Sequence, residues 1–165
     1  MSEYIKQAKT FLKQTNTTFK AEFLENGYHF DSDKEPRDIY KITLTKGSRE
    51  YTFNFGQSII KSGKYKLYGK HPYNDMVKMR NDSRQKYNHG LDFDKNKEYS
   101  QPTAYDILAC LTDYDPGTFE NFCDTFGYDV DSISTNKTYE AVKDEYSNVC
   151  MLWNDKEIEL LQEIC

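Results

Sequence analysis

Residues 40–55 read YKITLTKGSREYTFNF, and this stretch decides the expected fold. Apolar and polar residues alternate from Tyr40 to Thr45, a turn containing Gly47 follows, and they alternate again from Tyr51 to Phe55. Alternation with a period of two on both sides of a glycine-containing turn is typical of an antiparallel hairpin with one buried face. The same alternation over residues 17–24 predicts a third strand, so we expect a three-stranded antiparallel meander.

Helical spacing of apolar residues occurs on both sides of this meander. Residues 2–14 predict one amphipathic helix that packs on the sheet. From residue 102 onward the apolar spacing is helical again and predicts four further helices, at about 103–112, 116–127, 134–149 and 154–164. The expected fold class is α+β: an N-terminal antiparallel β-meander with a flanking helix, followed by a compact C-terminal helical unit.

Capping residues give the predicted helices their ends. Thr103 with Asp106 and Asn154 with Glu157 have the spacing of capping boxes. Asp115 followed by Pro116 predicts an N-cap with proline at the first helical position. Gly127 predicts the C-terminal cap of the same helix.

Length and composition restrict the class of protein. The 165 residues, 15% of them aromatic and 30% charged, fit one folded globular protein. No apolar run approaches the roughly 18 residues of a membrane span, and the start MSEYIKQAKTF does not resemble a signal peptide. The four cysteines, none in a CxxC pair, are Cys110, Cys123, Cys150 and Cys165. We expect them to be reduced thiols, and we expect no metal site or cofactor.

Charge divides the chain into three regions: 1–60 with the helix and sheet, a basic and aromatic segment at 61–100, and an acidic four-helix unit at 101–165. Residues 61–90 hold eight Lys and Arg against two Asp, a net charge of +6. The last region holds fourteen acids against three lysines, a net charge of −11. Such asymmetry indicates a macromolecular partner.

The basic segment is the first candidate binding site. Lysine and arginine neutralise phosphates, and interleaved tyrosines can stack on unpaired bases at about 1–3 kcal/mol each. The expected contacts with a nucleic acid or a protein carrying one are Lys64, Tyr65, Lys66, Tyr68, Lys70, Arg80, Arg84 and Lys86.

Exposed acids of the last region supply an alternative. Rows of carboxylates on helices can imitate the phosphates of a nucleic acid and occupy the channel of a nuclease. The candidate residues for that contact are Asp113, Glu120, Asp124 and Asp144.

Catalytic motifs are sparse. No phosphate-binding loop, nucleophile elbow, zinc-protease signature or dinucleotide fingerprint occurs, so we do not expect an enzyme. A small ribonuclease using His71 or His89 stays an alternative, because histidines beside Lys and Arg can exchange protons around a phosphate. We expect both histidines to lie in an exposed polar loop.

Two blocks, TNTTFKAEFLENG…RDIYKITLTKGSREYTFNFGQSI and PTAYDILACLTDYDPGTFENFCDTFGYDVDS, resemble an orphan family of small proteins carried by bacteriophages and other mobile elements. The resemblance implies a phage-encoded protein in the bacterial cytoplasm, with residues 61–100 as the variable part. Small phage proteins of this kind are often inhibitors of host defence, including anti-CRISPR proteins. Together with the basic segment, this context leads us to expect an RNA-guided nuclease or its guide RNA as partner. A phage protein that binds single-stranded nucleic acid is an alternative.

Overall fold

The computed structural model describes residues 2–30, 33–69, 71, 74–87 and 99–165, with the backbone alone at 74, 75 and 84–87. The described part is α+β, as predicted, and contains three strands and seven helices. In chain order these are α1 (Glu3–Gln14), β1 (Thr17–Gly27), β2 (Arg37–Lys46), β3 (Arg49–Phe55), α2 (Ile59–Ser62), α3 (Asn74–Tyr87), α4 (Ala104–Thr112), α5 (Phe119–Phe126), α6 (Ile133–Cys150) and α7 (Asp155–Ile164).

The predicted meander is confirmed. β2 is the central strand and pairs antiparallel with β1 on one side and β3 on the other. Ile42 is fully buried at its centre, opposite Ala21 of β1 and Phe53 of β3. Gly47 in the β2–β3 turn has a φ of +61°, the left-handed region that glycine adopts without steric cost.

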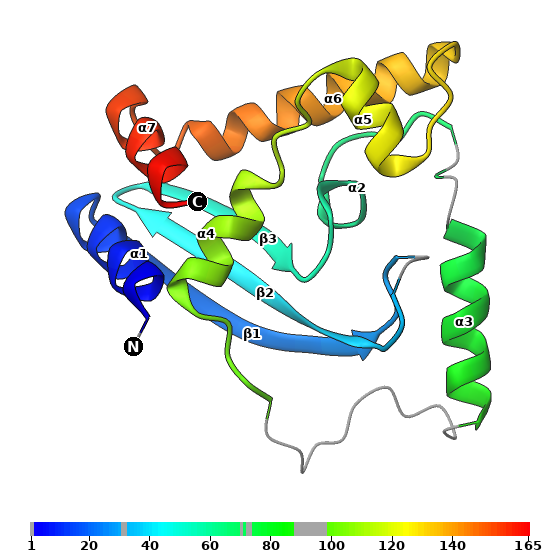
Figure 1. Cartoon of the computed structure of the whole chain (residues 1–165), viewed down its shortest axis with the longest axis horizontal. Coiled ribbons are helices and arrows are strands. Elements are labelled where there is room, and N and C mark those ends of the chain that lie inside the picture. Colours follow the sequence, from blue (N-terminus) through cyan, green and yellow to red (C-terminus); the bar gives the residue numbers. More distant parts are fainter. Residues whose placement is uncertain (1, 31–32, 70, 72–73, 88–98) are drawn as a thin grey trace.

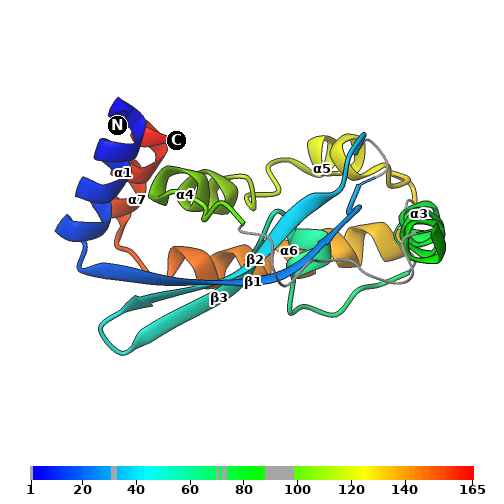
Figure 2. The same cartoon turned by 90° about the horizontal axis from the view of Figure 1, so that it is seen from below.

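Helices cover one face of the sheet. Figures 1 and 2 show α1, α4, α5 and α7 on the same side of the strands, with α6 running beside β3. Phe11 of α1, Leu44 of β2, Leu108 of α4 and Val142 of α6 belong to one buried apolar cluster. The N-terminal sheet and the C-terminal helices therefore share a single hydrophobic core.

Both predicted capping boxes are present. Asp106 N–H donates to Thr103 Oγ1 at 3.1 Å, and Thr103 N–H donates to Asp106 Oδ2 at 2.9 Å. Asn154 and Glu157 make the equivalent pair at the start of α7. Each box thus satisfies two backbone N–H groups at the N-terminus of its helix that would otherwise lack an acceptor.

The predicted start of α5 is wrong. The N-cap is Thr118, whose side chain accepts the N–H of Asn121 at 3.2 Å, and not Asp115. Gly117 has a φ of +65°, which no helix continues through, so a helix beginning at Pro116 would be interrupted. Asp115 instead accepts the N–H of Gly117 at 3.0 Å and forms a turn. The predicted C-cap at Gly127 is confirmed.

Helix α3 is attached to the loop after β1 through polar contacts. The Asn81 side chain donates to the carbonyl oxygen of Tyr28 at 2.8 Å and accepts its N–H at 2.9 Å. Among the described side chains of α3, Val77 is the one buried apolar residue. The helix therefore lacks the apolar stripe from which periodicity predicts a helix.

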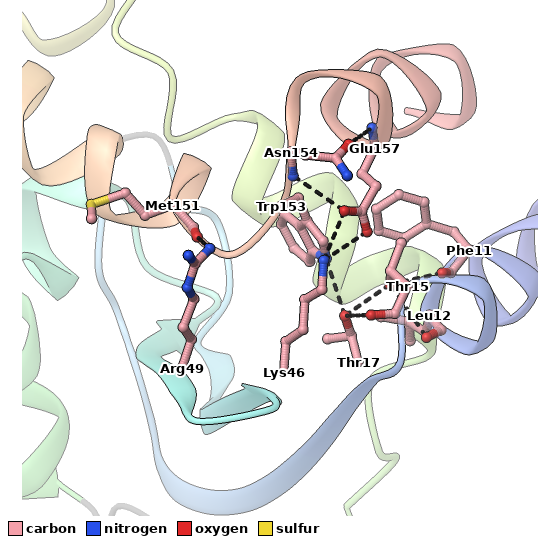
Figure 3. Close-up of polar contacts among 10 residues, drawn as sticks. All are labelled: Phe11, Leu12, Thr15, Thr17, Lys46, Arg49, Met151, Trp153, Asn154 and Glu157. Carbon is pink, nitrogen blue, oxygen red and sulfur yellow. Dashed lines mark hydrogen bonds and ion pairs between the residues drawn. The ribbon is translucent and has the colours of Figure 1, made fainter.

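A set of polar contacts joins the sheet to the α6–α7 junction (Figure 3). We call it the hairpin clasp; it consists of Thr17, Lys46, Arg49, Met151, Trp153 and Glu157. Lys46 Nζ lies 2.7 and 2.8 Å from the two carboxylate oxygens of Glu157. Trp153 Nε1 donates to Thr17 Oγ1 at 3.0 Å, and Arg49 donates to the carbonyl oxygen of Met151. Residues far apart in sequence are thereby fixed at one end of the sheet.

Candidate partner-binding surface

Residues 64–69, here called the strap, leave α2 and cross to the N-terminal half of α6 (Figure 1). Ser62 Oγ accepts the N–H of Asn54 at 2.8 Å and ties the end of α2 to β3. Gly63 then makes the turn into the strap, where a Cβ atom would overlap the ring of Tyr65. The start of the strap is therefore set by the end of β3 and by one glycine.

Thr138 of α6 holds the other end of the strap. Its fully buried hydroxyl lies 2.8 Å from the carbonyl oxygen of Tyr68 and accepts the N–H of Tyr68 at 3.2 Å. The same hydroxyl lies 3.0 Å from the carbonyl oxygen of Ser134 in its own helix. Because both backbone groups of Tyr68 are satisfied by one side chain, the strap is anchored against α6.

Three ammonium groups lie over two tyrosine rings on this surface. Lys66 Nζ and Lys137 Nζ lie 5.1 and 5.8 Å from the ring centroid of Tyr68, and Lys64 Nζ lies 5.4 Å from that of Tyr51. Each distance is within the roughly 6 Å range of a cation–π contact. All three lysines are exposed, so their charges face solvent. Sequence reasoning missed Lys137 because it belongs to the acidic region.

Tyr65 is placed differently from Tyr68. Its ring packs against the hydrophobic core, and its buried hydroxyl has no hydrogen-bond partner among the described residues. Burial, followed by the charges of Tyr128 and Glu145, raises the pKa of Tyr65 above its ordinary value. Tyr68, whose ring is partly exposed, is therefore the tyrosine of the strap that a partner could reach.

Comparison of the chain with protein-family models, with curated proteins and with solved structures found no match.

Arg80 does not join the strap. Arg80 donates to the carbonyl oxygen of Phe30 at 3.1 Å, and its guanidinium lies 5.2 Å from the ring centroid of Tyr28. Arg80 thus contributes to holding α3 on the β1–β2 loop. Lys70 and the side chains of Arg84 and Lys86 lie outside the described residues.

The four acidic candidates are exposed, but three helices supply them. Glu120 and Asp124 lie one turn apart on α5, where like charges cost about 0.2–0.5 kcal/mol. Asp144 is on α6, and Asp113 caps the end of α4. Glu120 and Asp124 are the two that form a continuous acidic face on one helix.

His71 does not lie where the sequence predicts. His71 is 5% exposed, with its ring centroid 5.6 Å from that of Tyr128, so its predicted exposure is wrong. His29 is also buried, with Nδ1 3.0 Å from Gln57 Nε2. Burial lowers the pKa of each to about 4, so both rings are neutral at pH 7. His89 lies outside the described residues.

The described ranges contain neither a cluster of metal-ligating side chains nor a helix suited to a membrane. No three His, Cys, Asp or Glu side chains there gather as a metal ion would require. None of the helices in these ranges is long and apolar enough to cross a membrane.

Proposed function

We propose that this protein is a phage-encoded inhibitor of a bacterial defence system, and that it binds an RNA-guided nuclease or the guide RNA of that nuclease. The observation that carries the proposal is that the ammonium groups of Lys66 and Lys137 both lie close to the partly exposed ring of Tyr68. Lysines neutralise phosphates and release counterions, and a tyrosine ring can stack on an unpaired base. An inhibitor of this kind requires affinity and no chemistry.

The anchoring of the strap supports the proposal. Thr138 fixes the backbone of Tyr68, and Gly63 fixes the turn before the strap. A binding segment that is already ordered loses less conformational entropy when it meets its partner. Lys64, Lys66 and Lys137 are therefore presented on a surface with a defined shape.

A pull-down from a bacterial host with an active RNA-guided nuclease tests the proposal. The tagged protein is recovered from a nuclease-treated lysate and an untreated one, and the bound proteins are identified by mass spectrometry. Recovery of the effector from both lysates supports a direct protein contact, and recovery from the untreated lysate alone supports a contact through guide RNA. Recovery of nucleic acid without an effector contradicts the inhibitor and favours a phage single-stranded nucleic-acid-binding protein.

Charge reversal identifies the surface. The triple variant Lys64→Glu/Lys66→Glu/Lys137→Glu is expected to lose effector recovery. The control Lys6→Glu/Lys9→Glu/Lys41→Glu changes the net charge by the same amount and uses exposed lysines on α1 and β2. This control is expected to recover the effector as the parent protein does. If binding runs through RNA, three phosphate contacts predict a slope of about −2 for log Kobs against log salt concentration. Undiminished recovery by the first variant would rule out the strap.

The acidic alternative has one observation in its favour, the exposed pair Glu120 and Asp124 on α5. The variant Glu120→Lys/Asp124→Lys is measured in the same pull-down. Loss of the effector with this variant, combined with retention by the strap variant, would assign the contact to nucleic-acid mimicry.

A further inference from the structure

A cleft of about 560 Å³ opens where α4 and α5 meet the end of β3. Its walls include Phe30, Arg37, Phe55, Asp106, Asp113 and Phe126. Small-molecule sites have volumes of about 300–1,000 Å³ and combine apolar walls with a few polar groups. The α4–α5 cleft has that size and that composition.

The two faces of α4 explain why the cleft is open. Ala104, Ile107, Leu108 and Leu111 enter the core, whereas the opposite face contributes residues 106, 109, 110 and 113 to the cleft. Residues 109 and 110 are alanine and cysteine, which are too small to fill it. The opposite side is a tight turn at Gly56, with a φ of +96°, where a Cβ atom would lie 2.7 Å from Ile39 Cδ1. Small side chains on α4 and the close turn at Gly56 thus leave the space of the cleft between them.

Aromatic rings form the apolar walls. Phe30, Phe55 and Phe126 come from the β1–β2 loop, the end of β3 and the end of α5, and each is partly exposed. Burying the remaining ring surface against a flat aromatic ligand is favourable, because aromatic side chains stack on the faces of bases. The walls therefore favour a planar ring system.

Arg37 provides a fixed cation at one wall. Its guanidinium lies 5.1 Å from the ring centroid of Phe30, and Nη2 donates to Asp33 Oδ1 at 2.6 Å. Asp33 also accepts the N–H groups of His29 and Phe30, each at 3.0 Å. Burial alone would raise the pKa of Asp33, but these hydrogen bonds and Arg37 hold it below its ordinary value. The Arg37 side chain is 47% exposed, so N–H groups remain for a ligand.

Carboxylates stand on the α4 wall of the same cleft. Asp106 and Asp113 are exposed and lie two turns apart on α4. Asp106 uses Oδ2 for the N–H of Thr103, which leaves Oδ1 as an acceptor. One wall therefore donates hydrogen bonds, and another accepts them.

We propose that the α4–α5 cleft binds a guanine base. Guanine is planar, presents the acceptors O6 and N7 to an arginine fork, and presents the N1–H and N2–H donors to a carboxylate. Adenine has an amino donor where guanine has O6, and the pyrimidines offer a smaller ring surface. The base could belong to a free guanine nucleotide or to an unpaired guanosine in RNA; the recognition is the same. This inference does not depend on the strap.

Calorimetric titration of the full chain tests the site. The probes are GMP, AMP, CMP, UMP and a short oligouridine with or without one central guanosine. GMP is expected to bind at least about ten-fold more tightly than AMP, CMP and UMP, or the guanosine-containing RNA at least about ten-fold more tightly than plain oligouridine. Binding of GMP assigns the cleft to free nucleotides, and binding of the guanosine RNA alone assigns it to unpaired bases.

Two variants locate the binding. Asp113→Asn is expected to weaken guanine binding about ten-fold, whereas Asp144→Asn, an exposed residue of α6 outside the cleft, is expected to leave it unchanged. Arg37→Lys keeps a charge beside Asp33 but removes the fork, so it is also expected to weaken binding. The strap variant of the previous section should bind GMP normally. Equal affinity for all four nucleotides, absence of guanine binding, or full affinity in Asp113→Asn and Arg37→Lys would overturn the proposal.

Discussion

The hydroxyl of Thr138 satisfies both backbone groups of Tyr68, and this one side chain places the strap. In the sequence, Thr138 is a polar residue within a helical pattern, next to Tyr139. Periodicity predicts which face of a helix is buried but gives no indication of a hydrogen bond between residues 70 positions apart. The sequence therefore named Lys66 and Tyr68 as contacts, but the position of the strap against α6, beside Lys137, could not be predicted from it.

Thr138→Val is expected to lower the free energy of unfolding by about 1–3 kcal/mol, because the N–H and carbonyl oxygen of Tyr68 lose their partner. Urea unfolding measures the change, and amide hydrogen exchange at Tyr68 should become faster. The control Thr43→Val, on β2, retains its strand pairing and should cost much less. Unchanged exchange at Tyr68 would show that Thr138 does not hold the strap.

His71 makes the stability of the protein depend on pH. Its pKa is about 4 in the folded protein, because burial disfavours the charged ring, and 6.5 without burial. As pH falls from about 6.5 to 4, the unfolded chain binds a proton that the folded protein does not, so stability is lost over this window. From pH 7 to pH 5 the loss is about 2 kcal/mol.

His71→Phe should remove that contribution while keeping the ring contacts with Phe126 and Tyr128. Urea unfolding of both proteins at pH 7 and pH 5 measures the difference. Between pH 7 and pH 5 the free energy of unfolding of the variant should fall by about 2 kcal/mol less than that of the parent. The pH dependence that remains includes a similar contribution from His29, whose pKa burial also lowers to about 4. Identical pH dependence would mean that His71 is not buried in solution.

At the scale of elements, strand alternation and capping boxes were reliable signals. The meander follows from Ile42 and its neighbours, and α4 and α7 begin at the predicted caps. These signals are local, since each involves residues within a few positions of one another. Helix α3 and the strap depend on distant partners, as Asn81 with Tyr28 shows, and local patterns do not contain that information.

The N-cap of α5 gives a direct test of the corrected helix start. Thr118→Ala should cost about 1 kcal/mol of stability, because the N–H of Asn121 loses its acceptor. Asp115→Ala should cost less, because Asp115 accepts one N–H, that of Gly117, in an exposed turn. Chemical denaturation of both variants checks this; a larger loss of stability with Asp115→Ala than with Thr118→Ala would restore the sequence-based start.

At the scale of the whole molecule, the ion pair of the hairpin clasp connects the sheet with α7. Burial alone would raise the pKa of Glu157, but the hydrogen bonds from Lys46 and Asn154, with the charge of Lys46, hold it below the ordinary value of 4.5. The stabilisation is therefore present above pH 4.5 and is lost as pH falls through the lower, folded value.

Lys46→Met should destabilise the protein by about 1–3 kcal/mol at pH 7, because a mostly buried carboxylate loses its partner. The loss should shrink as Glu157 becomes protonated in acid. Lys20→Met is the matched control: its ion pair with Glu22 is exposed and should contribute less than about 1 kcal/mol. A Lys46/Glu157 double-mutant cycle isolates the pair, and a coupling energy near zero would contradict the assignment.

The contacts of the hairpin clasp can form only late in the synthesis of the chain. Thr17, Lys46 and Arg49 leave the ribosome long before their partners Trp153, Glu157 and Met151 are translated. One end of the apolar face of the sheet therefore stays uncovered until α7 emerges from the ribosome. Contacts of such long sequence separation slow folding and expose the nascent chain to chaperones. Ribosome-bound chains that stop before Trp153 should accordingly remain sensitive to protease, and chains that include α7 and have cleared the exit tunnel should become resistant.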